Sequence, residues 1–235
     1  MRIKKITSAH KFIPLFLQTL IWFPTRLIFA IFGRYKVYGK ENLKDIRQAI
    51  FAVNHTSELD PIILTAALYP LGRFAPMFYV VAPAREFKSD KFRWRKYIYT
   101  NTFFTAWGAH ATVRGLHDYE KSLITHIKLL KRGESLCVFP EGKITKTGEP
   151  GEPHGGIIHL SRESGVPIVP VAITGVYKMT LQLFFRRKRH MVLEFGKPVF
   201  EHQIPIIATE QYRTEAARIF SSIYSMFKKR RINTK

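Results

Sequence analysis

The chain has 235 residues, of which 38 are Lys or Arg and 17 are Asp or Glu, so its formal net charge is +21. This length suits one α/β domain with a substantial core, and the charge favours phosphate-bearing partners such as nucleic acid, a lipid surface or small acidic substrates. The single cysteine, Cys137, excludes an internal disulfide framework and a cysteine metal cage, and a reducing, cytosol-facing location is the simpler interpretation.

The chain opens with a basic and then apolar segment. Residues 1–11 carry four cations, and residues 12–33 are almost wholly apolar. This length is close to the ~20 apolar residues of a spanning helix, but Pro14 and Pro24 interrupt the segment and cations flank both of its ends. Because the positive-inside tendency draws both ends to the same side of a membrane, an interfacial or re-entrant helix is favoured over a span. We therefore predict that residues 1–34 dock the protein on the cytoplasmic face of an anionic phospholipid membrane, with a single short transmembrane segment as the alternative.

Strand-like and helix-like patterns alternate between residues 35 and 227. Strands are expected at residues 35–39, 49–53, 77–82, 110–113, 136–139 and 168–173, and helices at residues 61–68, 118–132, before Gly165, and at residues 212–227. Strands joined by helices imply one α/β domain, residues 35–227, with a central mixed or mostly parallel sheet flanked by helices. Residues 180–195 are expected to form a β-hairpin with four cations at its turn, and residues 228–235 form a basic C-terminal tail.

His55 and Asp60 stand on the turn that follows the apolar run 49–53. This turn falls at the carboxyl end of a buried strand, where open α/β sheets keep their functional sites. An imidazole beside a carboxylate forms a base with an orienting partner. The pair alone is a weak signal, because a histidine near a strand end is more often a structural residue.

Two further strand-end loops carry candidate functional residues. Arg114 follows the strand-like run 110–113, and Phe139-Pro140-Glu141-Gly142 ends the apolar strand that begins near residue 136. If these strands are parallel, a base, a cation and a glycine-bearing turn converge on one rim of the sheet. The neighbouring Ser57 lacks the Gly-x-Ser-x-Gly context of a serine hydrolase, and the remaining histidines lack metal-ligand spacing.

With these residues in place, the chain resembles the glycerolipid acyltransferase family typified by lysophosphatidate acyltransferase. Four blocks occur in the order of the family: His55 to Asp60, Arg114, Phe139 to Gly142, and Val166 to Ala172. The resemblance covers about residues 36 to 200.

The resemblance implies a membrane-associated O-acyltransferase with no cofactor, and no metal site is expected because the histidines lack metal-ligand spacing. His55 is then the general base on the acceptor hydroxyl, and Asp60 orients the imidazole. The acyl group comes from acyl-CoA or acyl carrier protein, and the acceptor is a lysophospholipid, chiefly 1-acylglycerol-3-phosphate, which yields phosphatidate. Arg114 is expected to bind the acceptor phosphate, and Glu141 and Gly142 to form the acceptor-binding turn.

The chain departs from the family directly after this turn, where relatives carry a small hydroxyl residue and then an arginine. Here the residues are Lys143 and Ile144. Lys143 either supplies the charge for the phosphate as a point cation or lies, like Lys146, on an exposed polar loop. A different lysolipid acceptor therefore stays open.

A non-catalytic basic protein that binds an anionic membrane or nucleic acid is the alternative of another class. The apolar N-terminal segment argues against a soluble nucleic-acid binder, so no nucleic-acid partner is expected. Residues 88–99, which mix basic and aromatic side chains, suit a lipid headgroup layer or a solvated basic face equally.

Overall fold

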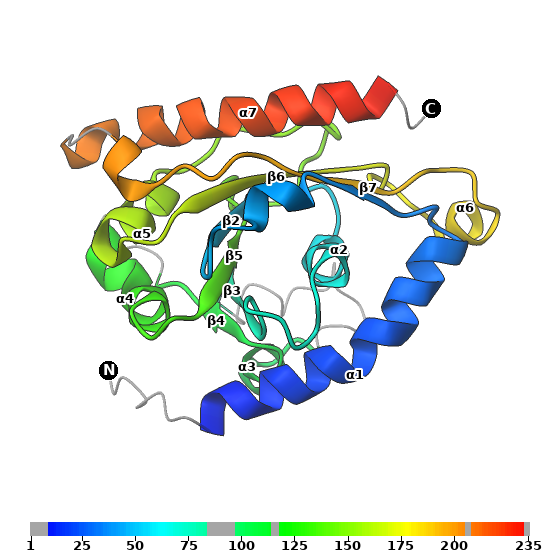
Figure 1. The fold of residues 1–235 in the computed structure, drawn as a ribbon, viewed down its shortest axis with the longest axis horizontal. Coiled ribbons are helices and arrows are strands. Elements are labelled where there is room, and N and C mark those ends of the chain that lie inside the picture. The colour runs from blue at the N-terminus through cyan, green and yellow to red at the C-terminus, as the bar shows by residue number, and fades with distance from the viewer. Residues whose placement is uncertain (1–8, 84–96, 114–117, 205–207, 233–235) are drawn as a thin grey trace.

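Seven strands form one sheet in the computed structural model, which describes residues 9–83, 97–113, 118–204 and 208–232. Their order in the sheet is β1-β7-β6-β2-β5-β3-β4 (Figure 1). The strands are β1 (Lys36–Tyr38), β2 (Ile50–Val53), β3 (Met77–Val81), β4 (Ala109–Ala111), β5 (Ser135–Val138), β6 (Ile168–Thr174) and β7 (Val192–Phe195). Neighbours from β6 to β4 are parallel, whereas β7 is antiparallel to β6 and parallel to β1. The expected mostly parallel sheet with helices is confirmed.

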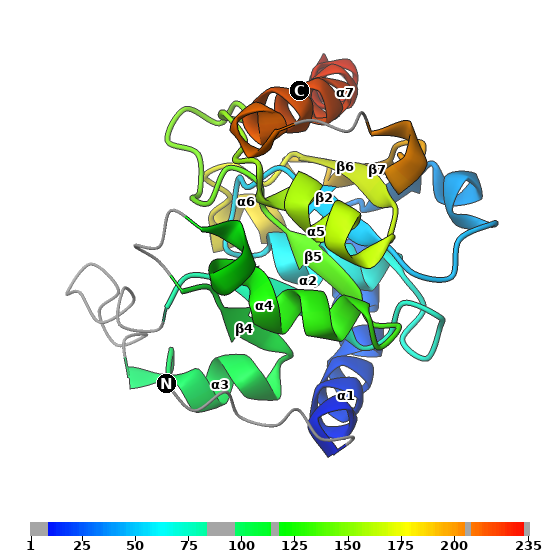
Figure 2. The same ribbon diagram turned by 90° about the vertical axis from the view of Figure 1, so that its left-hand side faces the viewer.

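Helices cover both faces of the sheet (Figures 1 and 2). The helices are α1 (Ala9–Ile31), α2 (Asp60–Ala67), α3 (Asn101–Ala106), α4 (Tyr119–Leu130), α5 (Gly156–Ser164), α6 (Leu181–Phe185) and α7 (Tyr212–Ile232). In β2, Phe51 and Val53 belong to the core shared with α1 and α2, whereas Ile50 and Ala52 belong to the core shared with α4, α5 and α7. Because both faces of this strand are buried, its sequence is continuously apolar instead of alternating.

The apolar N-terminal segment is one helix, α1, which continues through Pro14 and Pro24. Polar side chains on one side of α1 form hydrogen bonds with the backbone of the α/β domain. The Gln18 amide donates to the Met77 carbonyl at 2.8 Å and accepts from the Met77 N–H at 2.8 Å. The Trp22 indole donates to the Leu68 carbonyl at 2.6 Å. The helix is therefore part of the folded domain and not a separate appendage.

The hairpin expected at residues 180–195 is wrong in its first half. Residues Leu181–Phe185 form helix α6, whose start is capped by the Thr180 side chain. Phe184 packs against Phe29 of α1, and Phe185 lies 5.1 Å from Phe32, directly after α1, between ring centroids. This tertiary contact outweighs the β-propensity of the aromatic residues. Only β7 forms as expected, and its antiparallel partner is β6.

The C-terminal helix α7 continues beyond residue 227 through the basic residues to Ile232. Arg230 forms an ion pair with Glu194 at 2.5 Å, and Arg231 forms one with Glu149. The predicted edge strand at residues 35–39 is confirmed as β1. Most of the basic and aromatic stretch 88–99 lies outside the described residues.

Candidate active site at the carboxyl edge of the sheet

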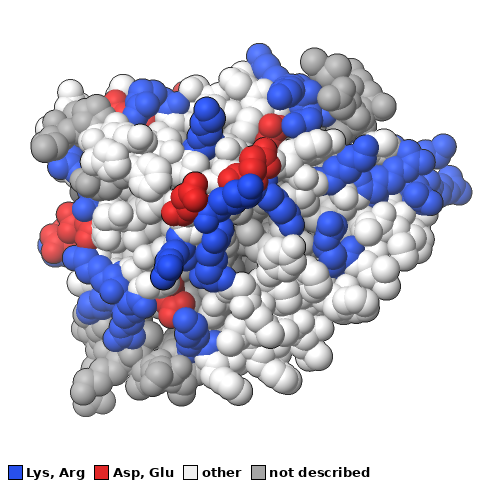
Figure 3. Space-filling model, viewed as in Figure 1, with Lys and Arg blue, Asp and Glu red and all other residues white. Residues whose placement is uncertain are grey.

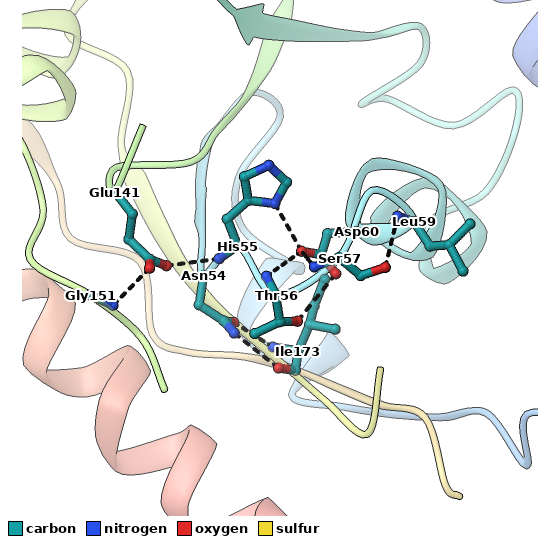
Figure 4. Close-up of polar contacts among 9 residues, drawn as sticks. All are labelled: Asn54, His55, Thr56, Ser57, Leu59, Asp60, Glu141, Gly151 and Ile173. Carbon is teal, nitrogen blue, oxygen red and sulfur yellow. Dashed lines mark hydrogen bonds and ion pairs between the residues drawn. The ribbon is translucent and has the colours of Figure 1, made fainter. Parts of the chain in front are cut away.

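His55 lies on the turn between β2 and α2, and Asp60 is the first residue of α2. The Nδ1 atom of His55 is 3.0 Å from the Oδ2 atom of Asp60 (Figure 4). An ionised carboxylate only accepts hydrogen bonds, so Nδ1 carries the hydrogen and Nε2 presents its lone pair. The His55 side chain is 17% exposed and that of Asp60 is fully buried. A substrate can therefore reach the imidazole but not its partner.

Asp60 is held by the turn that it closes. Its Oδ2 atom also accepts from the backbone N–H groups of Thr56 at 2.7 Å and Ser57 at 2.8 Å. Burial raises the pKa of the Asp60 carboxyl group, and the hydrogen bonds from His55, Ser57 and Thr56 oppose this rise. These donors keep the carboxylate oriented toward Nδ1.

Glu141 fixes the backbone on the other side of His55. Its Oε1 atom accepts from the His55 N–H at 2.8 Å, and its Oε2 atom accepts from the Gly151 N–H at 2.7 Å (Figure 4). Glu141 is buried, with 3% of its surface exposed. Burial raises the pKa of the Glu141 carboxyl group, and the two backbone hydrogen bonds oppose that rise. Glu141 thus joins the His55 turn to the loop at Gly151.

The Phe-Pro-Glu-Gly turn also supports the imidazole ring. The Phe139 ring stacks on it, with 4.0 Å between ring centroids and 21° between ring planes. The Gly142 N–H donates to the Phe139 carbonyl at 3.0 Å, and Gly142 has a φ of +66°, which favours glycine. The Thr145 N–H donates to the His55 carbonyl at 2.8 Å. The sequence pattern predicts that this turn lies at the same rim of the sheet as His55, but it does not predict the stacking of the Phe139 ring on the imidazole.

Asn54 locks the end of β2 to β6 and was not singled out from the sequence. Its side-chain amide donates to the Ile173 carbonyl at 3.0 Å, and its oxygen accepts from the Ile173 N–H at 2.7 Å. The residue is fully buried. The Asn54 side chain thus continues the hydrogen bonding between β2 and β6 where the β2 backbone turns away. The only sequence feature that could have indicated this role is the position of Asn54 at a strand end, directly before His55.

Of the two candidate phosphate-binding cations, Arg114 and Lys143, only Lys143 is among the described residues. Arg114 lies outside the described residues. Lys143 is exposed and stands at a cavity of about 390 Å³ that is otherwise lined mainly by apolar residues of the sheet, α4 and α5, including Leu123, Val138, Phe139 and Ile157. This cavity adjoins the ring on which His55 stacks. Among the described residues, no three His, Cys, Asp or Glu side chains gather as a metal site.

A reachable imidazole, oriented by a buried carboxylate at the carboxyl edge of an α/β sheet, is the arrangement with which enzymes draw a proton from a hydroxyl nucleophile. The family model described as Acyltransferase matches residues 34–174, more than half of the chain. The chain belongs to this family and is an acyltransferase.

Two relatives carry the same activity in their names. The 1-acyl-sn-glycerol-3-phosphate acyltransferase of Bacillus subtilis (strain 168) is 28% identical over 176 residues, which cover 75% of this chain and 79% of the relative. A probable enzyme of that name from Mycoplasma pneumoniae is 28% identical over 130 residues, covering 55% of this chain but only 46% of the relative.

The crystal structure of the 1-acyl-sn-glycerophosphate (LPA) acyltransferase PlsC from Thermotoga maritima is similar in fold. Its TM-score is 0.65 at 21% sequence identity, with 97% of this chain and 83% of that chain covered. The similarity supports the α/β fold with its N-terminal helix.

Proposed function

We propose that the chain transfers a fatty acyl group from an acyl thioester, acyl-CoA or acyl carrier protein, to the free hydroxyl of 1-acylglycerol-3-phosphate, giving phosphatidate. The observation that carries this proposal is the contact of 3.0 Å between Nδ1 of His55 and Oδ2 of Asp60 at the rim of the sheet. The names of the relatives supply the acceptor.

In the proposed mechanism, Nε2 of His55 takes the proton of the acceptor hydroxyl while the hydroxyl oxygen attacks the thioester carbonyl carbon. Asp60 stabilises the imidazolium that forms, because a charged donor binds a carboxylate more strongly than a neutral one. The tetrahedral intermediate then breaks its carbon–sulfur bond, and the imidazolium returns the proton to the leaving thiolate. No covalent enzyme intermediate and no cofactor take part.

The apolar cavity beside Phe139 is the proposed place for a fatty acyl chain. It has apolar walls from the sheet, α4 and α5, and burying each methylene contributes about 0.8 kcal/mol. Lys143 at its mouth supplies a cation for the acceptor phosphate, in the role that an arginine fills in relatives, and Arg114 is proposed as a second one. Gly142 lets the backbone approach the acceptor. Glu141 is proposed to stabilise this turn without contacting the acceptor, because both of its carboxylate oxygens already accept from backbone N–H groups.

Helix α1 is proposed to dock the enzyme on an anionic membrane. Phe12, Phe16, Leu20 and Phe23 are spaced three or four residues apart and are 58% to 71% exposed, so they form one apolar stripe. Where α1 lies in Figure 1, the lower right flank of the molecule is largely free of charged side chains, and a cluster of Lys and Arg lies above it at the right (Figure 3).

The attachment of α1 to the domain supports docking over spanning. The inner side of the helix is bound through Gln18 and Trp22, so the helix lies along the domain with its outer stripe free for lipid. Arg186 and Arg187 are exposed beside it, and each cation near an anionic surface contributes about 1 kcal/mol. Arg230 and Arg231 contribute less, because they form ion pairs within the domain.

The test is acyl transfer by the wild-type protein in detergent micelles, with a labelled acyl thioester and a panel of lysolipid acceptors. The proposal predicts a diacyl product with lysophosphatidate at a higher kcat/KM than with lysophosphatidylcholine or lysophosphatidylethanolamine. Preference for another headgroup would move the assignment to that acceptor, and no transfer to any acceptor would contradict it.

A further inference from the structure

A second cavity, of about 300 Å³, lies at the same edge of the sheet. Thr56 lines it, and Figure 4 shows the Thr56 side chain and the His55 imidazole directed to different sides of their turn. The other polar residues around it are Thr174, Tyr177, Lys188, Arg189 and Arg231. It shares no lining residue with the apolar cavity beside Phe139. The mechanism above leaves this cavity without a role.

Thr174 has an unused hydroxyl in this cavity. It is the last residue of β6 and is 2% exposed. Its Oγ1 atom has no hydrogen-bond partner among the described residues. A buried hydroxyl without a partner is costly, and native proteins retain such a group when a ligand or another unseen partner uses it.

Three cations line the same cavity as this hydroxyl. Lys188 and Arg189 follow helix α6, and Arg231 comes from α7, where Glu149 forms an ion pair with it. Arg189 donates to the Tyr177 carbonyl at 2.5 Å, which engages one of the five N–H donors of its guanidinium group. Among the described residues, the cavity lining thus includes three cations and no carboxylate, and the neighbouring carboxylates are Glu149, paired with Arg231, and Asp60, which accepts from Thr56.

The chain brings these cations to Thr174 through a close approach that only glycine allows. Gly175, directly after Thr174, has a φ of +86°, and a Cβ atom there would lie 1.9 Å from the His190 carbonyl oxygen. This contact sets residues 188 and 189 beside the end of β6. Glycine at position 175 is therefore needed for the wall of the cavity.

We propose that the cavity formed by Thr56, Thr174, Lys188, Arg189 and Arg231 binds a phosphate group of one of the two substrates. A phosphate has several acceptor oxygens, which match a hydroxyl donor, an ammonium group and guanidinium groups. The inference rests on the proposed function for the identity of the ligand: either the phosphates of the acyl donor, or the acceptor phosphate, for which this cavity would then take the place of Lys143 and Arg114.

The direct test measures the binding of inorganic phosphate to the full chain in detergent, as the phosphate-dependent rise in unfolding temperature. Lys188→Gln/Arg189→Gln is expected to weaken this binding at least about tenfold, which corresponds to the loss of one charge-assisted hydrogen bond. The control is Lys128→Gln/Lys131→Gln, which removes two exposed cations of the α4 region and is expected to bind as the wild type does. Equal phosphate affinity in both double variants would overturn the proposal.

Thr174→Val separates binding from folding. Valine has the same shape without the hydroxyl, so in the absence of phosphate the variant is expected to unfold at a higher temperature than the wild type. Its phosphate affinity is nevertheless expected to fall. A variant that is more stable and binds phosphate as well as the wild type would show that the hydroxyl has no ligand.

Steady-state kinetics then distinguish the two sources of the phosphate. With an acceptor phosphate in the cavity, Lys188→Gln/Arg189→Gln raises the KM for lysophosphatidate about tenfold and leaves the KM for acyl-CoA unchanged. With a donor phosphate there, the KM for acyl-CoA rises instead. Unchanged KM values for both substrates would contradict the proposal. If the wild type transfers no acyl group, the proposed function fails, and the binding of inorganic phosphate alone decides the matter.

Discussion

Replacing Glu141 by glutamine tests whether this residue supports the His55 turn or contacts the acceptor. In the wild type, both carboxylate oxygens accept from backbone N–H groups, those of His55 and Gly151, at 2.8 and 2.7 Å. Glutamine keeps one acceptor oxygen but turns an NH₂ group toward the other N–H. Hydrogen bonds to a charged group contribute about 1.5–3 kcal/mol each. Losing one of them and leaving a buried amide without an acceptor should lower the free energy of unfolding by about 2–3 kcal/mol.

The same change should reduce kcat more than it changes KM for the acceptor. The His55 N–H loses or weakens its anchor, so the imidazole shifts relative to the acceptor hydroxyl, and a misplacement of about 1 Å can reduce the rate about 100-fold. Urea unfolding and initial rates of acyl transfer, both in the same detergent, measure the two effects. The control is Glu210→Gln, which removes an exposed carboxylate. A stable Glu141→Gln variant with only a raised acceptor KM would refute the supporting role and favour acceptor contact.

Three further predictions follow from other parts of the molecule. Asp60→Asn should lower kcat by on the order of 10³- to 10⁴-fold with little change in KM, because an amide no longer fixes the Nδ1–H tautomer of His55; initial rates check this, and a loss below tenfold would refute the orienting role. Phe16→Asp/Phe23→Asp should weaken sedimentation with anionic vesicles about 100-fold or more, since burying each ring contributes at least about 1.5 kcal/mol, whereas Tyr224→Asp on α7 should sediment normally. Burial lowers the pKa of His126 from 6.5 to about 4. Between these two pH values the unfolded chain binds a proton that the folded chain does not, so the free energy of unfolding should fall by about 3 kcal/mol from pH 6.5 to pH 4. Urea titrations should show a smaller fall in His126→Gln, and an equal fall would refute the contribution of His126.

The parts of the fold that depend on local pattern were predictable from the sequence. The run from Ile50 to Val53 is continuously apolar because the strand is buried on both faces, and length with flanking turns separates such a strand from a helix. His55 and Asp60 could be paired in advance because a tight turn between a strand and a helix leaves few places for side chains five residues apart.

The parts that depend on distant contacts were not predictable. Phe184 and Phe185 suit a strand, but they form a helix because Phe29 of α1 and Phe32 directly after it, about 155 residues earlier in the chain, supply their partners. The hydrogen bonds of Glu141 join residues 86 and 10 positions away, and no local pattern reports them. The interlock of Asn54 with Ile173 spans 119 positions. Such contacts follow from the winding of the sheet, which the alternation of strands and helices leaves open.

The most direct test of the central claim compares His55→Ala with the wild type for acyl transfer from a labelled thioester to lysophosphatidate in detergent micelles. His55 is the proposed base, its side chain is 17% exposed, and its backbone anchors do not involve the imidazole. The variant should therefore still fold, with an unfolding temperature lowered because the buried Asp60 loses one of its donors, and its kcat should fall by at least about 100-fold. A folded His55→Ala variant that transfers the acyl group at the wild-type rate would contradict the account.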